Sequence, residues 1–576
     1  MLYSFKKYQI TEIEDAITID GIKFNSHVIV RFYDAYDLPL QEIKLGVKPI
    51  EALVSEYVEN KNIILHNCFI KNLNLKKALN IEDRIECKTL SIKNSVIEAD
   101  TITDFSKLNI DSELTEFSYN YVLKGKLTLH GSKLSAKDND FSNNVYKNIE
   151  TDFSNTHWGN NINSFKNSVF FDGFKNFQYA NFASGEANFT NVDFGNGDVA
   201  FINVDFKNAK ANFKVANFNK GKVDFHYTHF GKKDTSFERV NFGEGTVDFS
   251  KVDFGESKVN FNRSKFEKGD VNFEGIELKN GKLTFKKTIF GDNAINFSEA
   301  LCPNSIFLFQ SALLGSSTFS FKEAVVKSLS FQSCHLNGYA DFRVKSVEEI
   351  DLRDSVVRDL LDFIPYDKPV EIATLQLFGM RLIGKLFIDW NLNNVHQLIE
   401  NQSNTTPSEK AYQYRLLKEN FHNTGEYIAE DQAYVAFKRM ESKNEYEQIG
   451  KQAALRKYSI LLPVYYFKEL LLDKAGLYAT SPVRVLWSML ITYVFFSLII
   501  AISAILQLGS LTGTKSFDIW QITADSFYFS IITYLTVGYG DYCPIGFEKW
   551  LAGIEGFVGV FLMAYFTVAF VRRILR

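Results

Sequence analysis

The residues whose types and spacing suggest chemistry lie near the C-terminus, in the stretch YLTVGYGDYCP at residues 534–544. Gly538 and Gly540 permit backbone torsions that are closed to other residues, so successive carbonyl groups can point in one direction. A stack of such oxygens can replace the water shell of a dehydrated cation. Thr536 adds a hydroxyl at one end of the stack, and Asp541 adds a carboxylate at the other. The chemistry predicted for this stretch is ion coordination by backbone oxygens.

Two apolar segments flank this stretch and have the length of membrane spans. Residues 486–508 are 23 residues without a charge, and residues 550–571 form a second apolar run. Basic residues precede the first span and follow the second, which places both termini in the cytoplasm. The N-terminus lacks the apolar region of a secretory signal, so we expect the long N-terminal part to stay in the cytosol.

A short pore helix is predicted between the two spans. Residues 524–535 fit a helix that enters the membrane only part-way, with its negative C-terminal end directed at a central cavity. Residues 536–540 then have the filter sequence of potassium channels in the required place. The side chains of Val537 and Tyr539 are expected to pack behind the filter. The filter residues are Thr536, Val537, Gly538, Tyr539, Gly540 and Asp541, and the carbonyls of the first four are the predicted K⁺ ligands.

Residues 483–576 resemble the two-span potassium-channel pore family. The resemblance implies a gating hinge in the inner helix at Gly559, with Gly556 as the alternative. Leu535 departs from the family, because many members have a second threonine there. Glu555 is a carboxylate inside the second span, so it must face protein or water, and we expect it to support the filter.

The stoichiometry follows from the filter. One segment supplies a quarter of the carbonyl ring, so four chains are needed and a homotetramer surrounded by membrane lipids is expected. K⁺ is the expected permeant ion, and no cofactor is predicted. The net charge of −4 and the pI near 6.2 give no basic field for nucleic acid. The five cysteines show no CxxC pairing and are interpreted as reduced core thiols.

A repeat dominates the N-terminal part, in a chain with 54 Phe and 27 Tyr. Phe recurs at every twelfth position from Phe141 to Phe321, and a second aromatic series is offset by five positions. A small or β-branched residue usually stands two positions before each Phe, with Asp or Asn between them, as in 252–254 (VDF). Alternation of this kind predicts three-residue strands with one inward face, separated by corners. A fixed short period indicates a solenoid.

The blocks VDF at 252–254 and VNF at 259–261 resemble the pentapeptide-repeat family, which implies a right-handed quadrilateral β-solenoid. Every second block here has seven residues rather than five, which is a departure from the family. A coil of about 24 residues is preferred over one of half that length, because two residues cannot reverse the chain across a gap of about 10 Å. With its pore segment, the whole chain looks like the bacterial pentapeptide-repeat potassium channels, which implies the cell (inner) membrane.

The predicted chain is multidomain. Thr406, Pro407 and Glu409 form the start of a helical hairpin. The segment after it is rich in aromatic, leucine and basic residues, which favours the membrane surface over the alternative of a buried helix. The predicted parts are an N-terminal cap (1–55), the β-solenoid (56–395, with the perfect period at 141–321), a helical hairpin connector (396–452), an interfacial amphipathic segment (453–482) and an all-α two-span pore domain (483–576).

The solenoid sequence offers little chemistry of its own. Gly195, Gly197 and Ala200 match a dinucleotide-binding pattern, but they fall on repeat corners outside any βαβ unit. A calcium-binding glycine-aspartate repeat would have a nine-residue period. Three polar residues lie close together in sequence and are interpreted as solvated. They are His226, His229 and Lys232. Since no nucleophile and base pair stands out, the chain is not expected to be an enzyme.

The sequence therefore predicts a potassium-selective homotetrameric channel. Its cytosolic solenoid is expected to be a regulatory or docking domain, coupled to the pore through the segment before the first span and able to take an unknown ligand or protein. The alternative is a membrane-anchored interaction scaffold whose pore is secondary. Voltage gating is disfavoured because no arginine-rich span exists, and the sequence names no other stimulus.

Overall fold

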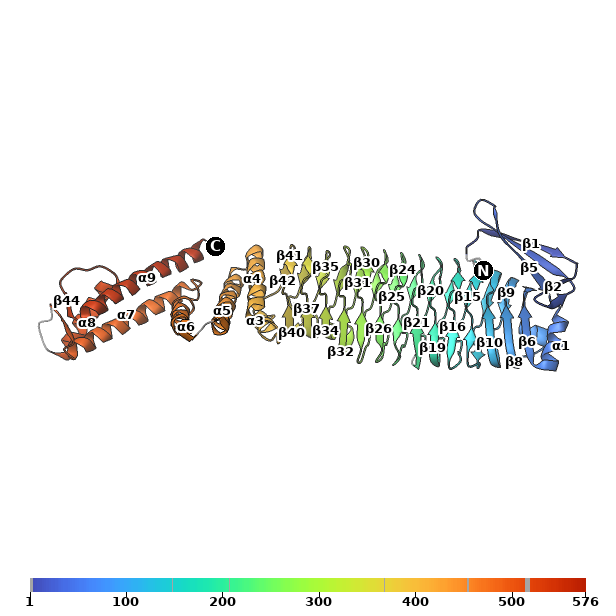
Figure 1. The fold of residues 1–576 in the computed structure, drawn as a ribbon, viewed down its shortest axis with the longest axis horizontal. Coiled ribbons are helices and arrows are strands. Elements are labelled where there is room, and N and C mark those ends of the chain that lie inside the picture. The colour runs from blue at the N-terminus through green and yellow to red at the C-terminus, as the bar shows by residue number, and fades with distance from the viewer. Residues whose placement is uncertain are drawn as a thin grey trace. The chain divides into compact units, whose positions relative to one another are not determined.

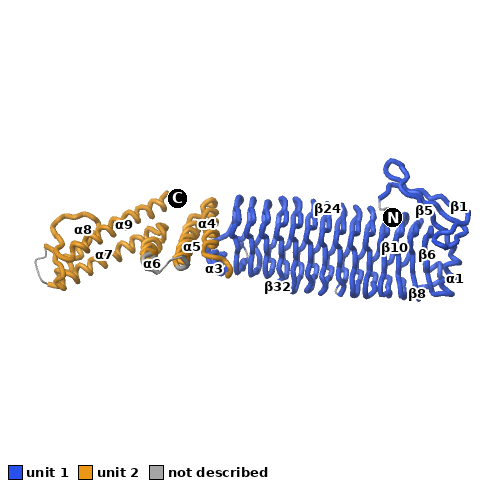
Figure 2. Tube along the Cα trace, in the orientation of Figure 1, with its two compact units in different colours: residues 1–402 blue, residues 403–576 orange. Residues whose placement is uncertain are grey.

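The fold consists of two compact units, which Figure 1 shows as a ribbon and Figure 2 shows in two colours. The first unit covers Met1–Gln402 and the second covers Ser403–Arg576. The computed structural model describes residues 4–575 apart from 148, 207, 367, 453–454 and 513–517.

The first unit is a β-solenoid whose coil strands pair in parallel with the strands one coil away. On one side, β20 (Val199–Ala200) pairs with β22 (Val223–Asp224), which pairs with β25 (Val247–Asp248) and then with β28 (Val271–Asn272). Each step joins equivalent positions of successive coils, such as Val199 and Val223. This register confirms the predicted coil of about 24 residues and excludes the coil of half that length in the regular zone.

Each coil has four sides, and Figure 1 shows the coils stacked one after another. Between β19 (Ser184–Asn188) and β22, one coil contributes four successive parallel pairings to the next coil. The pairings are β19 with β21 (Asn208–Asn212), Asp193 with Asn217, β20 with β22, and Asp205 with His229. The β-solenoid fold class predicted from the repeat is confirmed.

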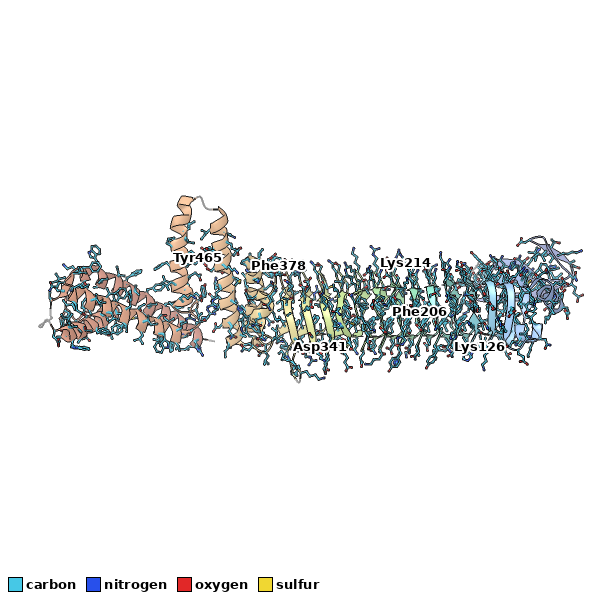
Figure 3. The ribbon with its side chains drawn as sticks, turned by 90° about the horizontal axis from the view of Figure 1, so that it is seen from below. Lys126, Phe206, Lys214, Asp341, Phe378 and Tyr465 are labelled. Carbon is cyan, nitrogen blue, oxygen red and sulfur yellow. The ribbon has the colours of Figure 1, made fainter. Side chains whose placement is uncertain are left out.

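The Phe residues of the main series form two ladders of stacked rings, because alternate members of the series lie on opposite sides of the coil. Phe213 and Phe237, which hold equivalent positions in successive coils, stack with ring centroids 5.0 Å apart and planes at 10°. Phe213 and Phe225, which are successive members of the Phe series, meet edge to face at 5.5 Å and 87°. Edge-to-face and stacked contacts are both favourable for aromatic rings. In Figure 3, Phe206 marks the interior of the solenoid and Lys214 its outer surface.

The Asp and Asn residues that precede many of the Phe residues support the corners. The Asp248 side chain accepts a hydrogen bond from the backbone N–H of Ser250 at 2.8 Å, and Asp253 accepts one from Gly255 at 2.8 Å. Such local bonds to the residue two positions later fix turns. These bonds therefore give the Asp and Asn ladder a structural role at the corners.

One corner of the regular zone repeats a left-handed backbone from coil to coil. Asn143, Asn167 and Asn191 hold equivalent positions in successive coils, with φ between 56° and 59°. The Asn191 amide donates to the Asn167 side chain at 3.0 Å, which donates to the Asn143 side chain at 3.1 Å. In the next coil the position is Val215, with φ of 61°. A β-branched residue is unfavourable in this conformation, whereas Asn tolerates it.

Val215→Asn is therefore expected to stabilise the solenoid by about 1 kcal/mol, because it removes backbone strain and extends the asparagine ladder. The matched control is Asn191→Val, which should lower stability by at least as much. Hydrogen exchange of the amides in the coil around residue 215 measures both changes. Unchanged or faster exchange in Val215→Asn would contradict the assignment of strain to this corner.

Both ends of the solenoid are covered. At the N-terminal end, β4 (His27–Tyr33) pairs antiparallel with β1 (Lys7–Ile13) and with β5 (Pro39–Val47), and helix α1 (Ile50–Asn60) follows. Phe32 of this small sheet packs on Tyr121 of a coil, with centroids 4.8 Å apart. At the other end, α3 (Val395–Glu400) packs on β40 (Glu371–Gln376). Such covers protect the open edges of a solenoid.

The second unit is helical. Thr406 and Glu409 form a complete capping box at the start of α4, and Gly425 ends this helix with φ of 79°. Residues 453–454 of the predicted interfacial segment lie outside the described residues. The helices are α4 (Pro407–Thr424), α5 (Tyr427–Gln452), α6 (Leu455–Glu469), the π-helix η1 (Leu470–Lys474), α7 (Pro482–Ile505), α8 (Ile519–Tyr534) and α9 (Glu548–Ile574).

Helices α7 and α9 are long and apolar enough to cross a membrane. Helix α7 begins before the predicted span, because Ser481 caps it and Pro482 occupies its first turn. Helix α8 begins before the predicted pore helix, and α9 extends the second predicted span at both ends.

Candidate functional site

The predicted filter follows directly on the end of α8. The backbone N–H of Val537 donates to the Ile532 carbonyl at 2.8 Å, and the N–H of Gly538 approaches the same oxygen at 3.3 Å. The backbone of Gly538 has φ of 58° and that of Gly540 has φ of 79°, which are conformations that side chains disfavour. Residues 536–541 are exposed in the single chain. The segment therefore leaves α8 as an exposed ribbon whose two glycines occupy left-handed conformations.

The outer end of the ribbon is fixed by contacts outside the filter. The Tyr528 hydroxyl on α8 donates to the Asp541 carboxylate at 2.9 Å. Beyond Asp541, β44 (Pro544–Gly546) pairs antiparallel with β43 (Gly509–Leu511). These contacts hold the end of the filter segment against the loop that follows α7. Sequence reasoning missed Tyr528, because a tyrosine within a predicted helix gives no specific signal of a bond to the filter.

Helix α8 is also bonded to α7 and α9. The Thr492 and Tyr534 hydroxyls are 2.7 Å apart, which joins α7 to the last residue of α8. The Ser530 hydroxyl donates to the Glu555 carboxylate, which joins α8 to α9. Glu555 is fully buried, and its second oxygen has no partner among the described residues. The predicted support residue thus contacts the pore helix, and its effect on the filter stays a prediction.

The two candidate hinge glycines differ sharply in their surroundings. A Cβ atom on Gly559 would lie 2.1 Å from the Tyr534 carbonyl oxygen, so α9 approaches α8 as closely as backbone allows. A Cβ atom on Gly556 would lie 3.9 Å from the Thr533 oxygen, which is ordinary contact. Helix α9 continues through both positions. Gly559 therefore has a packing role that its sequence did not reveal, and the hinge role remains a prediction.

A further carboxylate was not anticipated. Glu548, in the first turn of α9, is fully buried, and both of its oxygens lack partners within the described part of the chain. A Cβ atom on Gly509 would lie 3.0 Å from the Glu548 Cγ atom, so this side chain packs under β43. Acidic residues in the first turn complement the helix dipole, and this signal was present in the sequence.

Much of the apolar surface of the second unit is open in the single chain. Val537 is 47% exposed and Tyr539 is 73% exposed, although both were expected to pack behind the filter. Only 28% of the apolar window of α7 and 22% of that of α9 are buried within the chain. Surfaces of this kind are covered by lipid or by other chains.

The polar residues singled out on the solenoid do not form a common site. Gly197 lies at a corner, where a Cβ atom would meet the Asp172 carbonyl oxygen at 2.3 Å. The His229 ring lies 3.7 Å from Asp253, and the Lys232 ammonium lies 3.7 Å from Glu256. These side chains interact with separate neighbours, which agrees with their interpretation as surface residues.

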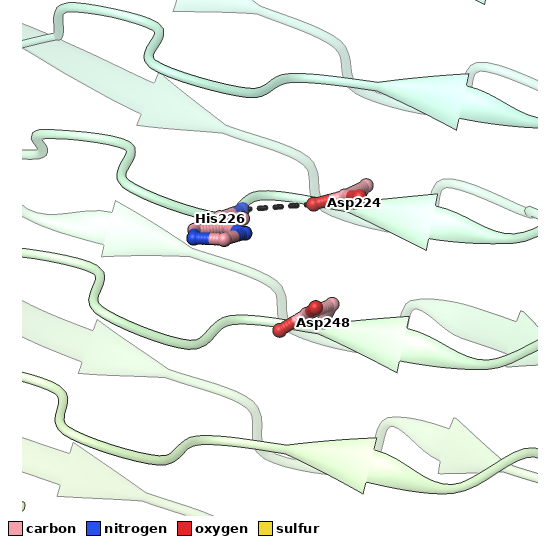
Figure 4. A group of neighbouring side chains, drawn as sticks. All are labelled: Asp224, His226 and Asp248. Atoms are coloured by element: carbon pink, nitrogen blue, oxygen red, sulfur yellow. Dashed lines mark hydrogen bonds between the residues drawn. The ribbon is translucent and has the colours of Figure 1, made fainter.

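Asp224, His226 and Asp248 come together on one side of the solenoid (Figure 4). Asp224 accepts the backbone N–H of His226 at 3.0 Å, as the corner aspartates do elsewhere, and forms an ion pair with Lys222 at 2.9 Å. The Lys222 ammonium therefore already neutralises this carboxylate. The repeat accounts for the group without a metal ion.

Comparison with known proteins assigns the C-terminal part of the second unit. Residues 488–576 match the ion-channel family. No curated protein and no solved structure has significant similarity to the chain. The C-terminal part is therefore an ion-channel domain with two membrane-spanning helices, and the protein is a membrane protein. An ion-channel domain after a β-solenoid fits the pentapeptide-repeat-containing two-span potassium channels that the sequence resembles.

Proposed function

We propose that the protein is a potassium-selective channel. The observation that carries the proposal is the Thr-Val-Gly-Tyr-Gly ribbon at residues 536–540, which leaves the pore helix with both glycines in left-handed conformations. A ring of carbonyls from such ribbons replaces the hydration shell of K⁺. The proposed ligands are the carbonyls of Thr536, Val537, Gly538 and Tyr539, with K⁺ as the permeant ion and no cofactor.

The proposed assembly is a homotetramer. One chain supplies a quarter of the carbonyl ring, and a closed ring of identical filters requires fourfold symmetry. The exposed side chains of Val537 and Tyr539 support this assembly, because an adjacent chain would cover them. The apolar faces of α7 and α9 left open in the single chain would then contact other copies or lipid.

The proposed location is the cell (inner) membrane, with both termini in the cytoplasm. Arg484 stands at the start of α7, and Arg572 and Arg573 stand at the end of α9, so both basic helix ends belong to the cytoplasmic side. The solenoid is then a cytosolic regulatory or docking domain. It acts on the pore through the segment before α7, as a regulator of transport rather than as an enzyme.

The test is ion flux through the purified protein in liposomes. With K⁺ on one side and Na⁺ on the other, the reversal potential of the wild-type protein should lie close to the K⁺ equilibrium potential. Gly538→Asp should carry no K⁺ current, because it places a charged side chain on a left-handed backbone within the filter. Equal passage of K⁺ and Na⁺, or a stoichiometry other than four, would contradict the proposal.

The alternative function is a membrane-anchored scaffold whose pore is secondary. The covered ends and the long, regular outer surface of the solenoid favour this alternative, because such surfaces commonly bind partners. A scaffold predicts tetramers without K⁺-selective flux in the same liposome experiment.

A further inference from the structure

The segment between η1 and α7 has an unusual backbone. Leu477, Tyr478 and Ala479 have φ of 49°, 54° and 62°, so three successive residues with side chains are left-handed. We refer to residues 477–479 as the left-handed turn. Each such residue is strained, because its Cβ atom crowds the following carbonyl oxygen. Runs of this kind persist only where surrounding contacts hold them.

One side chain of the inner helix bonds to this turn, in addition to the backbone bonds of Leu477 to Asp473 and of Tyr478 to Leu472. The Tyr565 hydroxyl on α9 accepts a hydrogen bond from the Ala479 N–H at 2.9 Å and donates one to the Leu472 carbonyl at 3.0 Å. A Cβ atom on Gly476 would lie 2.5 Å from the Tyr565 ring, so the segment lies directly against the aromatic ring. Tyr565 thus bridges the two sides of the strained segment, and we call this contact the Tyr565 bridge.

The connector helix α5 is bonded to the two elements that the Tyr565 bridge joins, which are the segment after α6 and the inner helix α9. Arg439 pairs with Asp473 of η1 through two guanidinium nitrogens, at 2.9 and 3.1 Å, and Asp473 is buried. Asp431 pairs with Arg572 at the end of α9, also at 2.9 Å. The Arg572 guanidinium also lies 4.4 Å from the centre of the Tyr434 ring. Helix α5 therefore contacts the inner helix directly as well as the segment that leads into α7.

Glu469 adds a second link between α5 and this segment. It accepts hydrogen bonds from the Ser442 hydroxyl of α5 at 2.5 Å and from the Tyr478 hydroxyl at 3.2 Å. Burial, together with the nearby Glu469, raises the pKa of the Tyr478 hydroxyl, so it stays a donor. A displacement of α5 would thus move the left-handed turn and the end of α9 together.

We propose that Tyr565 is a positioning residue for the inner helix, and that its bridge to the left-handed turn couples the connector helix α5 to the opening of the pore. The proposal rests on the channel function proposed above. Without the bridge, the strained turn relaxes, and this relaxation shifts the segment before α7 relative to the end of α9. This route reaches the inner helix directly, in addition to the path through the segment before the first span that the sequence predicts.

The first test is Tyr565→Phe in the full-length channel in planar bilayers. This change removes only the hydroxyl and leaves the ring in place. We expect at least a fivefold change in open probability, with unitary current and reversal potential unchanged. Tyr427→Phe is the matched control, because it removes a hydroxyl from a 43% exposed tyrosine at the start of α5, and it should change nothing. An unchanged open probability in Tyr565→Phe would overturn the proposal.

The second test asks whether the backbone strain of the left-handed turn is what links the Tyr565 bridge to the opening of the pore. Glycine adopts left-handed conformations without strain, so Ala479→Gly should hold the turn without the bridge. In that background, Tyr565→Phe should change open probability less than twofold. The same fivefold change in both backgrounds would overturn the role of the strained turn.

A readout without ion flow separates this proposal from the proposed function. In full-length protein, the Ala479 amide should exchange its hydrogen at least tenfold faster in Tyr565→Phe than in wild type, while amides of α8 remain unchanged. Equal exchange at Ala479 in both proteins would overturn the bridge. Loss of K⁺ selectivity in the wild type would instead contradict only the channel function.

Discussion

Gly559→Ala is expected to abolish selective K⁺ current. The new Cβ atom would lie 2.1 Å from the carbonyl oxygen of Tyr534, a backbone atom that cannot rotate away. Tyr534 is the last residue of α8 and stands two positions before Thr536, so any displacement that relieves the clash moves the start of the filter. The expected result is at least a hundredfold loss of K⁺ flux in liposomes, together with a lower melting temperature of the assembly.

Gly556→Ala is the matched control for this prediction. Its Cβ atom would lie 3.9 Å from the Thr533 oxygen, which requires no displacement, and alanine is the better helix former by about 1 kcal/mol. This variant should conduct like the wild type and be slightly more stable. If Gly559 acted only as a hinge, Gly559→Ala would also stabilise the helix and would alter opening without loss of selectivity. That pattern would contradict the packing role.

Phe237→Ala is expected to destabilise the middle of the solenoid by about 3–5 kcal/mol, because it leaves a cavity among packed rings. Phe237 is fully buried. Its ring stacks on one ring of the coil before and one of the coil after, and meets others at its edges. The six neighbouring rings are Phe213, Phe225, Phe230, Phe242, Phe249 and Phe261.

Hydrogen exchange of full-length protein measures this loss coil by coil. Stability in a solenoid is shared between neighbouring coils, so protection should fall most in the coil of Phe237 and in the coils on either side. Phe237→Leu is the control and should cost much less, since Leu278 already takes the place of a ring in the second aromatic series and is fully buried. Equal losses for both variants would show that ring packing is not the source of stability.

The features that depend on local pattern were predictable from the sequence. The recurrence of Phe predicts a solenoid and limits the coil to one or two Phe periods, and the strand pairing shows that two periods make one coil. Thr406 and Glu409 predict a capping box that the structure confirms, since both partners lie within one turn. The apolar runs located the two membrane helices to within a few residues, and these runs needed no tertiary information.

Contacts between distant parts of the chain were not predictable in this way. The bond between Asp431 and Arg572 joins residues 141 positions apart, and each looks like a surface charge in its own helix. The left-handed turn at 477–479 contains Leu, Tyr and Ala, which give no hint of a positive φ. The packing role of Gly559 was hidden as well, because close approach to Tyr534 is a property of two packed helices and not of either sequence.

Lys175 is a residue of the repeat whose contacts were also not predictable from the sequence. It occupies the position held by Val199 in the next coil and is fully buried, with its ammonium donating to the Phe171 carbonyl at 2.7 Å. Burial lowers the pKa of this lysine to about 8. The repeat predicted an inward-facing residue here, but only the folded chain provides the oxygen that makes a lysine acceptable.

The uniform spacing between coils also defines how the solenoid can change in length. Removing or duplicating one whole coil, for example residues 199–222, restores every ring and every corner to an equivalent neighbour. Removing half a coil keeps the short sequence period in phase, but it places residues of one side of the coil above those of the opposite side. All later coils would then be rotated by half a turn. Insertions and deletions in homologous chains should therefore accumulate as whole coils. The length of the solenoid can then change in evolution without changing the direction in which each of its sides faces.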